Sequence, residues 1–195
     1  MTSEQNYKGQ IVHFSLHTIY SIENPGFIPE EYSKFKHGAE NIARKYGYEL
    51  ADKFISNCFS KRYTGGKILI LPGAYSHIPT ASFYMKKYFV DKLNAFLYAA
   101  GYPVTEELKI YRSVSYREDY GEMSAEQRYS LIKNDTFYID RNFVENKIIL
   151  HLDDIKITGT HERIIINMLN NNNLNNDCYM LYFAELCSNE IQPSI

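Results

Sequence analysis

The feature that most constrains the fold of this chain is the stretch from Lys147 to Asn167. A largely apolar run, residues 148–152, leads into the paired acids Asp153 and Asp154, and a Thr-Gly-Thr triplet follows at 158–160. Apolar side chains then recur at helical spacing, at Ile164, Ile165, Met168 and Leu169. This order predicts a strand, a loop and a helix in direct succession.

The predicted turn has the residue types that bind a sugar phosphate. The N-terminus of a helix favours a phosphate, because its peptide dipoles and N–H groups point toward the anion. Gly159 lets the backbone close around that anion, and the hydroxyls of Thr158 and Thr160 can donate to it. Asp153 and Asp154 can accept hydrogen bonds from the vicinal hydroxyls of a ribose, or hold Mg²⁺ through water.

These residues resemble the phosphoribosyl-pyrophosphate (PRPP) loop of the type I phosphoribosyltransferases (PRTases). The resemblance implies that Asp153 and Asp154 are the catalytic acids and contact Mg²⁺ through water. It also implies a phosphate cradle formed by Lys156, Ile157, Thr158, Gly159 and Thr160. The alternative is an ordinary strand-to-helix turn without a ligand. Similarity of fold alone does not establish an activity.

A second strand-loop-helix unit precedes this one. The apolar run 67–71 is typical of a parallel strand covered on both faces, and residues 80–100 form a helical pattern after Pro79. The segment 71–81 resembles the pyrophosphate loop of the PRTases, with a spacing nearest to that of the orotate enzymes. The resemblance assigns pyrophosphate binding to Ala74, Tyr75, Ser76 and His77. Ser76 and His77 stand where those enzymes have Lys and Gly, and an exposed loop histidine is the alternative for His77.

A polar and aromatic segment, residues 115–135, has no buried periodicity, and long loops of this kind are usually functional or mobile. Orotate-type enzymes have a mobile catalytic lid at this place in the chain. The resemblance therefore implies a flexible lid or insertion at about 115–140. Its residues are Arg117, Asp119, Tyr120 and Glu122. The lysines that flank the lid in those enzymes are missing here.

The remaining patterns complete an α/β fold. Strands are predicted at 10–20, 108–114 and 178–186, and a helix that Gly38 and Gly47 weaken or bend is predicted at 31–57. Alternating strands and helices predict a mostly parallel sheet with helices on both faces, and we expect a single type I PRTase-like domain over residues 1–195. In such sheets the ligand lies beyond the carboxyl ends of the strands, so both loops should meet at one site.

Over most of its length the chain resembles a bacterial PRTase-like family associated with stress and tellurite-resistance operons. The segments that carry it are 32–38, 74–82, 119–121 with Arg128, 152–162 and 182–186. What members of that family transfer is not implied by these motifs.

Composition excludes several other classes of protein. The formal net charge of −2 gives no broad attraction to nucleic acid or to an anionic membrane. Without a signal peptide or a run of membrane-spanning length, we expect a cytoplasmic protein. Cys58, Cys178 and Cys187 should be free thiols, and His13 and His17 are more typical of packing or surface residues than of a metal pair. The sequence does not decide between a monomer and a homodimer.

Two functions fit these patterns. The first is an enzyme that binds Mg²⁺ and PRPP or a related nucleotide and transfers phosphoribosyl to an unidentified nitrogenous acceptor, releasing pyrophosphate. The second is a module that senses PRPP or a nucleotide without turnover, which the missing lysines favour. Orotate is not expected as the acceptor, because Glu118, Asp119 and Glu122 would repel its charge.

Overall fold

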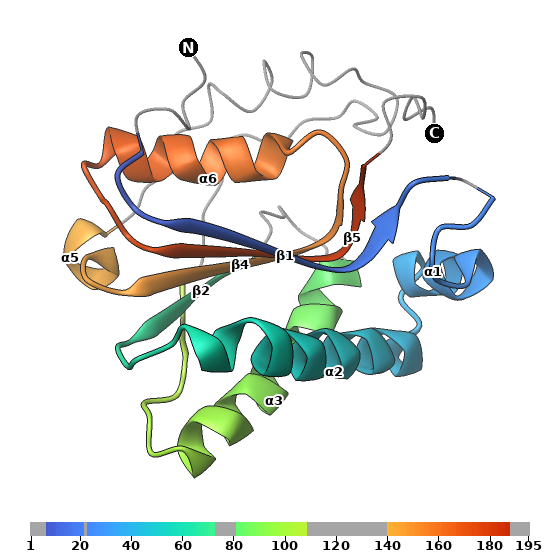
Figure 1. Ribbon diagram of the computed structural model, residues 1–195, viewed down its shortest axis with the longest axis horizontal. Helices are drawn as coiled ribbons and strands as arrows, with labels where there is room; N and C mark the ends of the chain where they lie inside the picture. Colours follow the sequence, from blue (N-terminus) through green and yellow to red (C-terminus); the bar gives the residue numbers. More distant parts are fainter. Residues whose placement is uncertain (1–6, 22, 73–80, 109–139, 188–195) are drawn as a thin grey trace.

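The computed structural model describes residues 7–21, 23–72, 81–108 and 140–187. Within these ranges the chain forms a five-stranded sheet in which all neighbouring strands are parallel (Figure 1). The strand order is β1-β5-β4-β2-β3. The strands are β1 (Ile11–Ile19), β5 (Cys178–Leu186), β4 (Ile148–Lys156), β2 (Ile68–Pro72) and β3 (Glu106–Glu107). The predicted parallel α/β sheet is confirmed.

Helices cover both faces of the sheet, as predicted. Figure 1 shows α6 (Thr160–Asn171) on one face, and α2 (Glu40–Asn57) and α3 (Ala81–Ala99) on the other. On the α6 face, Ile166 and Leu169 pack in one buried cluster with Leu69, Leu71 and Ile149. The second cluster lies under α2 and α3 and includes Leu50, Phe54, Phe89, Leu93, Ile68, Ile70 and Leu150.

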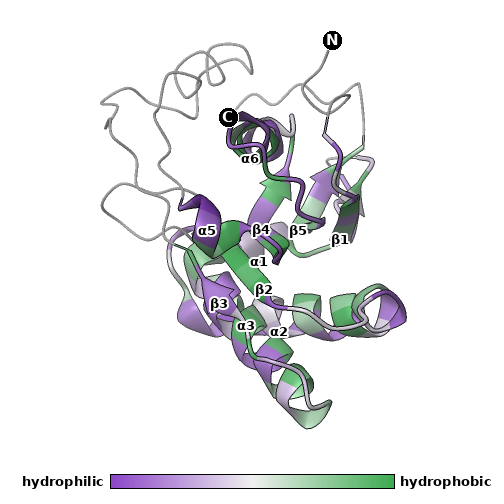
Figure 2. Cartoon of the chain, turned by 90° about the vertical axis from the view of Figure 1, so that its left-hand side faces the viewer, coloured by the Kyte–Doolittle hydropathy of each residue, from purple (hydrophilic) through white to green (hydrophobic). Residues whose placement is uncertain are grey.

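The apolar run in β2 is explained by these two layers. Successive side chains of a strand point to opposite faces. Ile68 and Ile70 therefore join the α2–α3 cluster, whereas Leu69 and Leu71 join the α6 cluster. Figure 2 shows β2 as hydrophobic ribbon in the middle of the molecule, while α2 and α3 alternate between hydrophobic and hydrophilic residues.

The helix predicted at 31–57 is two helices. The first, α1, spans Pro29–Lys36, and α2 begins at Glu40. Gly38 separates them with φ +89°, a left-handed conformation that a helix cannot contain and that glycine adopts without steric cost. Gly47 does not interrupt α2. A Cβ there would lie 2.4 Å from the carbonyl oxygen of Met85, so this glycine permits the close approach of α2 and α3.

The connections reverse direction between β2 and β4. β2 leads through α3 outward to β3, whereas β4 leads through α6 to β5 on the other side. This reversal is the topological switch point at which open α/β sheets bind ligands. Pro72 pairs in register with Leu152, so the chain leaves β2 beside Asp153. Residues 73–80, the predicted strand 108–114 beyond residue 108, and the lid segment lie outside the described residues.

Cys58, Cys178 and Cys187 are free thiols, although only Cys178 is buried. In the part of the chain that the structure describes, no helix combines the length and apolar character needed to cross a bilayer.

Candidate ligand-binding site

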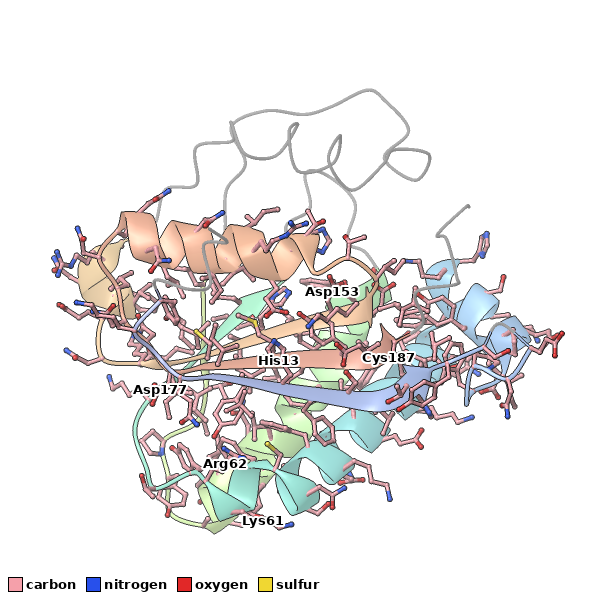
Figure 3. All side chains as sticks on the ribbon, turned by 45° about the horizontal axis from the view of Figure 1, so that its top comes forward. His13, Lys61, Arg62, Asp153, Asp177 and Cys187 are labelled. Carbon is pink, nitrogen blue, oxygen red and sulfur yellow. The ribbon has the colours of Figure 1, made fainter. Side chains whose placement is uncertain are left out.

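The paired acids lie within the last residues of β4, and their side chains contact different helices. β4 continues to Lys156, so Asp153 and Asp154 belong to the carboxyl end of the strand instead of following it. Side chains alternate along a strand. Asp153 therefore lies under the start of α6, as Figure 3 shows, whereas Asp154 contacts α1.

Asp153 is buried and bound to His161. The Nδ1 atom of His161 lies 2.6 Å from Oδ2 of Asp153, and the peptide N–H of Asp154 donates to Oδ1 at 2.9 Å. Burial alone would raise the pKa of Asp153, but the hydrogen bond and charge of His161 outweigh it and hold the pKa well below its ordinary value. The carboxyl group is therefore an anion hydrogen-bonded to the imidazole of His161, the second residue of α6.

Asp154 is bound by two side chains of α1. The hydroxyl of Tyr32 donates to Oδ2 at 2.9 Å, and Nζ of Lys36 lies 2.5 Å from the same oxygen. Burial, reinforced by the charge of Asp154, raises the pKa of Tyr32, so the phenol stays protonated and donates. The second acid thus joins the N-terminal helix to the carboxyl end of β4.

The predicted phosphate turn connects β4 to α6. Gly159 is the N-cap of α6 and has φ +67° and ψ +19°, the left-handed conformation that glycine favours. The hydroxyls of Thr158 and Thr160 lie 2.8 Å apart, and Nη2 of Arg163 donates to Thr160 at 3.4 Å. The first N–H groups of a helix have no carbonyl partner within it, so the turn presents donors to an anion.

Lys156, predicted as part of the phosphate cradle, is bound to two carboxylates. Its Nζ atom lies 3.1 Å from Oε2 of Glu162 and 3.3 Å from Oε1 of Glu185. Burial alone would lower its pKa, but the charges of the two acids raise it. The ammonium of Lys156 is therefore already neutralised by the protein, which leaves its peptide N–H as the part that suits a phosphate.

Glu162 joins α6 to three strands of the sheet. His13 of β1 lies 2.5 Å from its Oε1, and the hydroxyl of Tyr182 of β5 donates to Oε2 at 3.1 Å. Lys156 supplies the contact from β4. Burial by itself would raise the pKa of Glu162, but His13 and Lys156 lower it to about 2. This network fixes the start of α6, and with it the phosphate turn, over the strand ends.

His151 is buried on β4 beneath the same site. Its Nδ1 atom lies 3.2 Å from the carbonyl oxygen of Leu71 and donates to it. Burial lowers the pKa of His151, so the ring is neutral, and its Nε2 atom has no hydrogen-bond partner among the described residues. It forms part of the buried floor below Asp153.

A surface pocket brings most of the predicted phosphate and ribose contacts together. Its lining consists of Asp153, residues 155–162 and Tyr182. Asp154 lies outside this lining, on the α1 side. The predicted pyrophosphate residues 74–77 and lid residues 117, 119, 120 and 122 fall outside the described residues. Among the residues that are described, no three histidine, cysteine, aspartate or glutamate side chains meet as metal ligands.

Tyr32, Lys36, His13 and Tyr182 belong to the site and were not predicted as such from the sequence. Tyr32 and Lys36 stand in one of the segments that carry the family resemblance, which is the only sequence signal for them. His13 is bound to Glu162, and His17 packs against the rings of Phe27 and Phe183. His17 is a packing residue and His13 is an exposed surface residue that contacts Glu162, so the expectation of packing or surface roles is confirmed for both.

Comparison with known proteins agrees with this architecture. A search among curated proteins finds no match. The family model described as PRTase ComF-like matches residues 11–195, which includes every described strand and helix. The five-stranded parallel sheet with helices on both faces is consistent with a type I PRTase-like fold. The chain therefore belongs to the phosphoribosyltransferase ComF-like family.

Proposed function

We propose that this protein binds PRPP or a ribose 5-phosphate nucleotide with Mg²⁺ and transfers the phosphoribosyl group to a nitrogenous acceptor. The observation that carries the proposal is the turn after β4. Gly159 adopts a left-handed conformation, two threonine hydroxyls flank it, and a buried aspartate precedes it at the switch point of the sheet. Phosphate and ribose contacts are thus adjacent in a chain of a phosphoribosyltransferase family.

The roles follow from the geometry. Peptide N–H groups of 156–160, with Thr158 and Thr160, hold the 5′-phosphate at the start of α6. In the reaction, the bond from the anomeric carbon to pyrophosphate breaks and pyrophosphate leaves with the electron pair. The acceptor nitrogen forms the new bond and loses its proton to solvent. The fixed charges of Asp153 and Asp154 stabilise the positive charge that develops on the ribose.

The acids suit a hydrated Mg²⁺. The Oδ2 atom of Asp153 is bound by His161, and the Oδ2 atom of Asp154 is bound by Tyr32 and Lys36. These contacts disfavour direct coordination of the ion by both carboxylates. Mg²⁺ keeps several waters and is commonly bound by one or two carboxylates together with substrate phosphates. When bound, the ion supplies charge that stabilises the leaving pyrophosphate.

The second candidate is a sensor that binds PRPP or a nucleotide without turnover. It is supported by the neutralised ammonium of Lys156, which Glu162 and Glu185 bind. The absence of the lysine at position 76 and of the lysines that flank the lid also supports it. A site with fewer free cations binds the ribose phosphate but stabilises departing pyrophosphate less well.

A single experiment separates the two candidates. The protein is incubated with PRPP, Mg²⁺ and a panel of orotate, purine and pyrimidine bases, while released pyrophosphate and new nucleotide are measured. The Asp153→Asn, Asp154→Asn double variant is the control for contaminating activity. Transfer to a neutral or cationic acceptor supports the enzyme, and robust formation of orotidylate contradicts the expected exclusion of orotate. If no base yields pyrophosphate or nucleotide while PRPP still binds, the sensor is favoured. If PRPP does not bind, both candidate functions are rejected.

A further inference from the structure

Helix α1 brings a lysine to the carboxyl end of β4. Nζ of Lys36 lies 2.5 Å from Oδ2 of Asp154, and this carboxylate side chain is only 14% exposed. Figure 1 shows α1 at the end of the sheet toward which the strands point. The cation therefore lies at the edge of the sheet where the ligand of an open α/β fold is bound.

The position of α1 is fixed by packing and does not depend on this ion pair. Phe35 is fully buried and contacts the ring of Tyr46 at a centroid distance of 5.4 Å. The ring of Tyr32 stacks on Phe183 with an interplanar angle of 14°. Because an ion pair with a partly exposed lysine contributes little to stability, anchoring the helix does not account for Lys36.

Lys36 and Lys156 differ in how much of their charge the protein has already neutralised. Lys156 contacts two carboxylates and its side chain is 21% exposed. The side chain of Lys36 is 50% exposed, and Asp154 is its only carboxylate partner among the described residues. An ammonium has several N–H donors, so Lys36 can bind Asp154 and a ligand anion together.

The ligand of the proposed function requires such a cation. Carboxylates next to phosphate groups repel them by about 1 kcal/mol for each pair of unit charges at 4 Å in water, and more in a closed site. At position 76, where the orotate-type loop has a lysine, this chain has Ser76. A positive charge from another segment would compensate for that difference.

We propose that Lys36 is a ligand-binding residue whose ammonium bridges Asp154 and the pyrophosphate group of the ligand. The 5′-phosphate lies at the Thr158–Thr160 turn on the α6 side, and Lys36 approaches from the α1 side. The ribose then lies between the Thr158–Thr160 turn and Lys36. This assignment rests on the proposed function, because it names the residue that binds the leaving group of that reaction.

Calorimetry with three probes tests the assignment. PRPP, ribose 5-phosphate and inorganic pyrophosphate, each with Mg²⁺, are titrated into the wild type and into Lys36→Met, Lys36→Arg and Lys34→Met. Lys34 is exposed on the same helix and serves as the matched control for loss of one positive charge. Lys36→Met should weaken PRPP and pyrophosphate roughly 10-fold to 100-fold, the effect of one charge-assisted hydrogen bond. Ribose 5-phosphate should change little, Lys36→Arg should retain most of the affinity, and Lys34→Met should match the wild type.

The outcomes separate this assignment from the proposed function. If the wild type binds PRPP and Lys36→Met binds it as well as Lys34→Met does, the role of Lys36 is overturned while the function stands. If pyrophosphate binds through Lys36 but PRPP does not bind, the function is overturned while the anion site stands. Binding of neither probe by the wild type overturns both. Thermal melts verify folding, and Lys36→Gln, which can still donate to Asp154, replaces Lys36→Met if that variant does not fold.

Discussion

His161, the residue after the phosphate turn, is hydrogen-bonded through Nδ1 to Oδ2 of Asp153 at 2.6 Å. The pair joins the first turn of α6 to the carboxyl end of β4 and restrains the loop between them. Asp153 is buried, whereas the side chain of His161 is 44% exposed, so solvent reaches one side of this contact. The same contact orients the acid that we assign to the ribose and the helix that we assign to the phosphate.

Replacing His161 with phenylalanine should leave the buried Asp153 carboxylate without its side-chain hydrogen-bond partner. We expect the free energy of unfolding to fall by about 1 to 3 kcal/mol, as for other buried polar groups that lose a partner. Urea denaturation measures this change. In a double-mutant cycle with Asp153→Asn, the second substitution should cost clearly less than it does alone. Additive effects would show that the two side chains do not interact in solution.

Gly159→Val should prevent phosphate binding while leaving the domain folded. The residue has φ +67°, which is unfavourable for a β-branched side chain, whereas the nearest atom to a new Cβ, Cε of Lys156, lies at an ordinary 3.6 Å. The strain therefore falls on the turn and not on the core. Gly159→Asn is the matched control, because asparagine tolerates the left-handed conformation. Thermal melts with and without PRPP should show ligand-induced stabilisation for the asparagine variant and none for valine. Equal stabilisation of both variants would contradict the assigned role of the turn.

Glu162→Gln should destabilise the protein at neutral pH by roughly 3 kcal/mol, because it removes one partner of a buried ion-pair network. The network lowers the pKa of Glu162 from 4.5 to about 2. A carboxyl group with a depressed pKa contributes its full stability above its unfolded value, and this contribution is lost as the pH falls toward the folded value. The gap in unfolding free energy between wild type and variant should therefore be constant above about pH 4.5 and should shrink between pH 4.5 and pH 2.

Denaturation curves across this pH range measure the gap. Glu23→Gln, at an exposed position, is the control and should leave the unfolding midpoint close to that of the wild type. A gap between the wild type and Glu162→Gln that persists at pH 2 would show that the charge of Glu162 does not stabilise the start of α6.

Local patterns were sufficient to predict the parallel sheet, most of its helices and the turn between β4 and α6. The alternation of apolar runs and helical spacing identified β2, β4 and β5, and the order of acids, threonines and glycine located the turn before α6. These elements depend on residues that are close together in the chain. Their positions could therefore be inferred without knowing how the strands are ordered.

The partners of the acids could not be predicted in this way. His13 reaches Glu162 only because β1 pairs with β5, which pairs with β4, and this order is not encoded in any local spacing. Lys36 and Tyr32 reach Asp154 only because Gly38 ends α1 before α2 begins. The basic side chains of that segment have the pattern of a solvated helix face, so their charge alone does not indicate a site.

We assign Asp153 and Asp154 to the ribose of a phosphoribosyl ligand. Calorimetric titration of PRPP with Mg²⁺ into the wild type and into the Asp153→Asn, Asp154→Asn double variant tests this assignment most directly. Each substitution removes a charged acceptor for a hydroxyl group or a hydrated metal, and such hydrogen bonds contribute on the order of 1.5 to 3 kcal/mol. The wild type should bind PRPP, and the double variant, still folded by thermal melt, should lose most of its affinity. Equal affinity in the two proteins would contradict the assignment of the site.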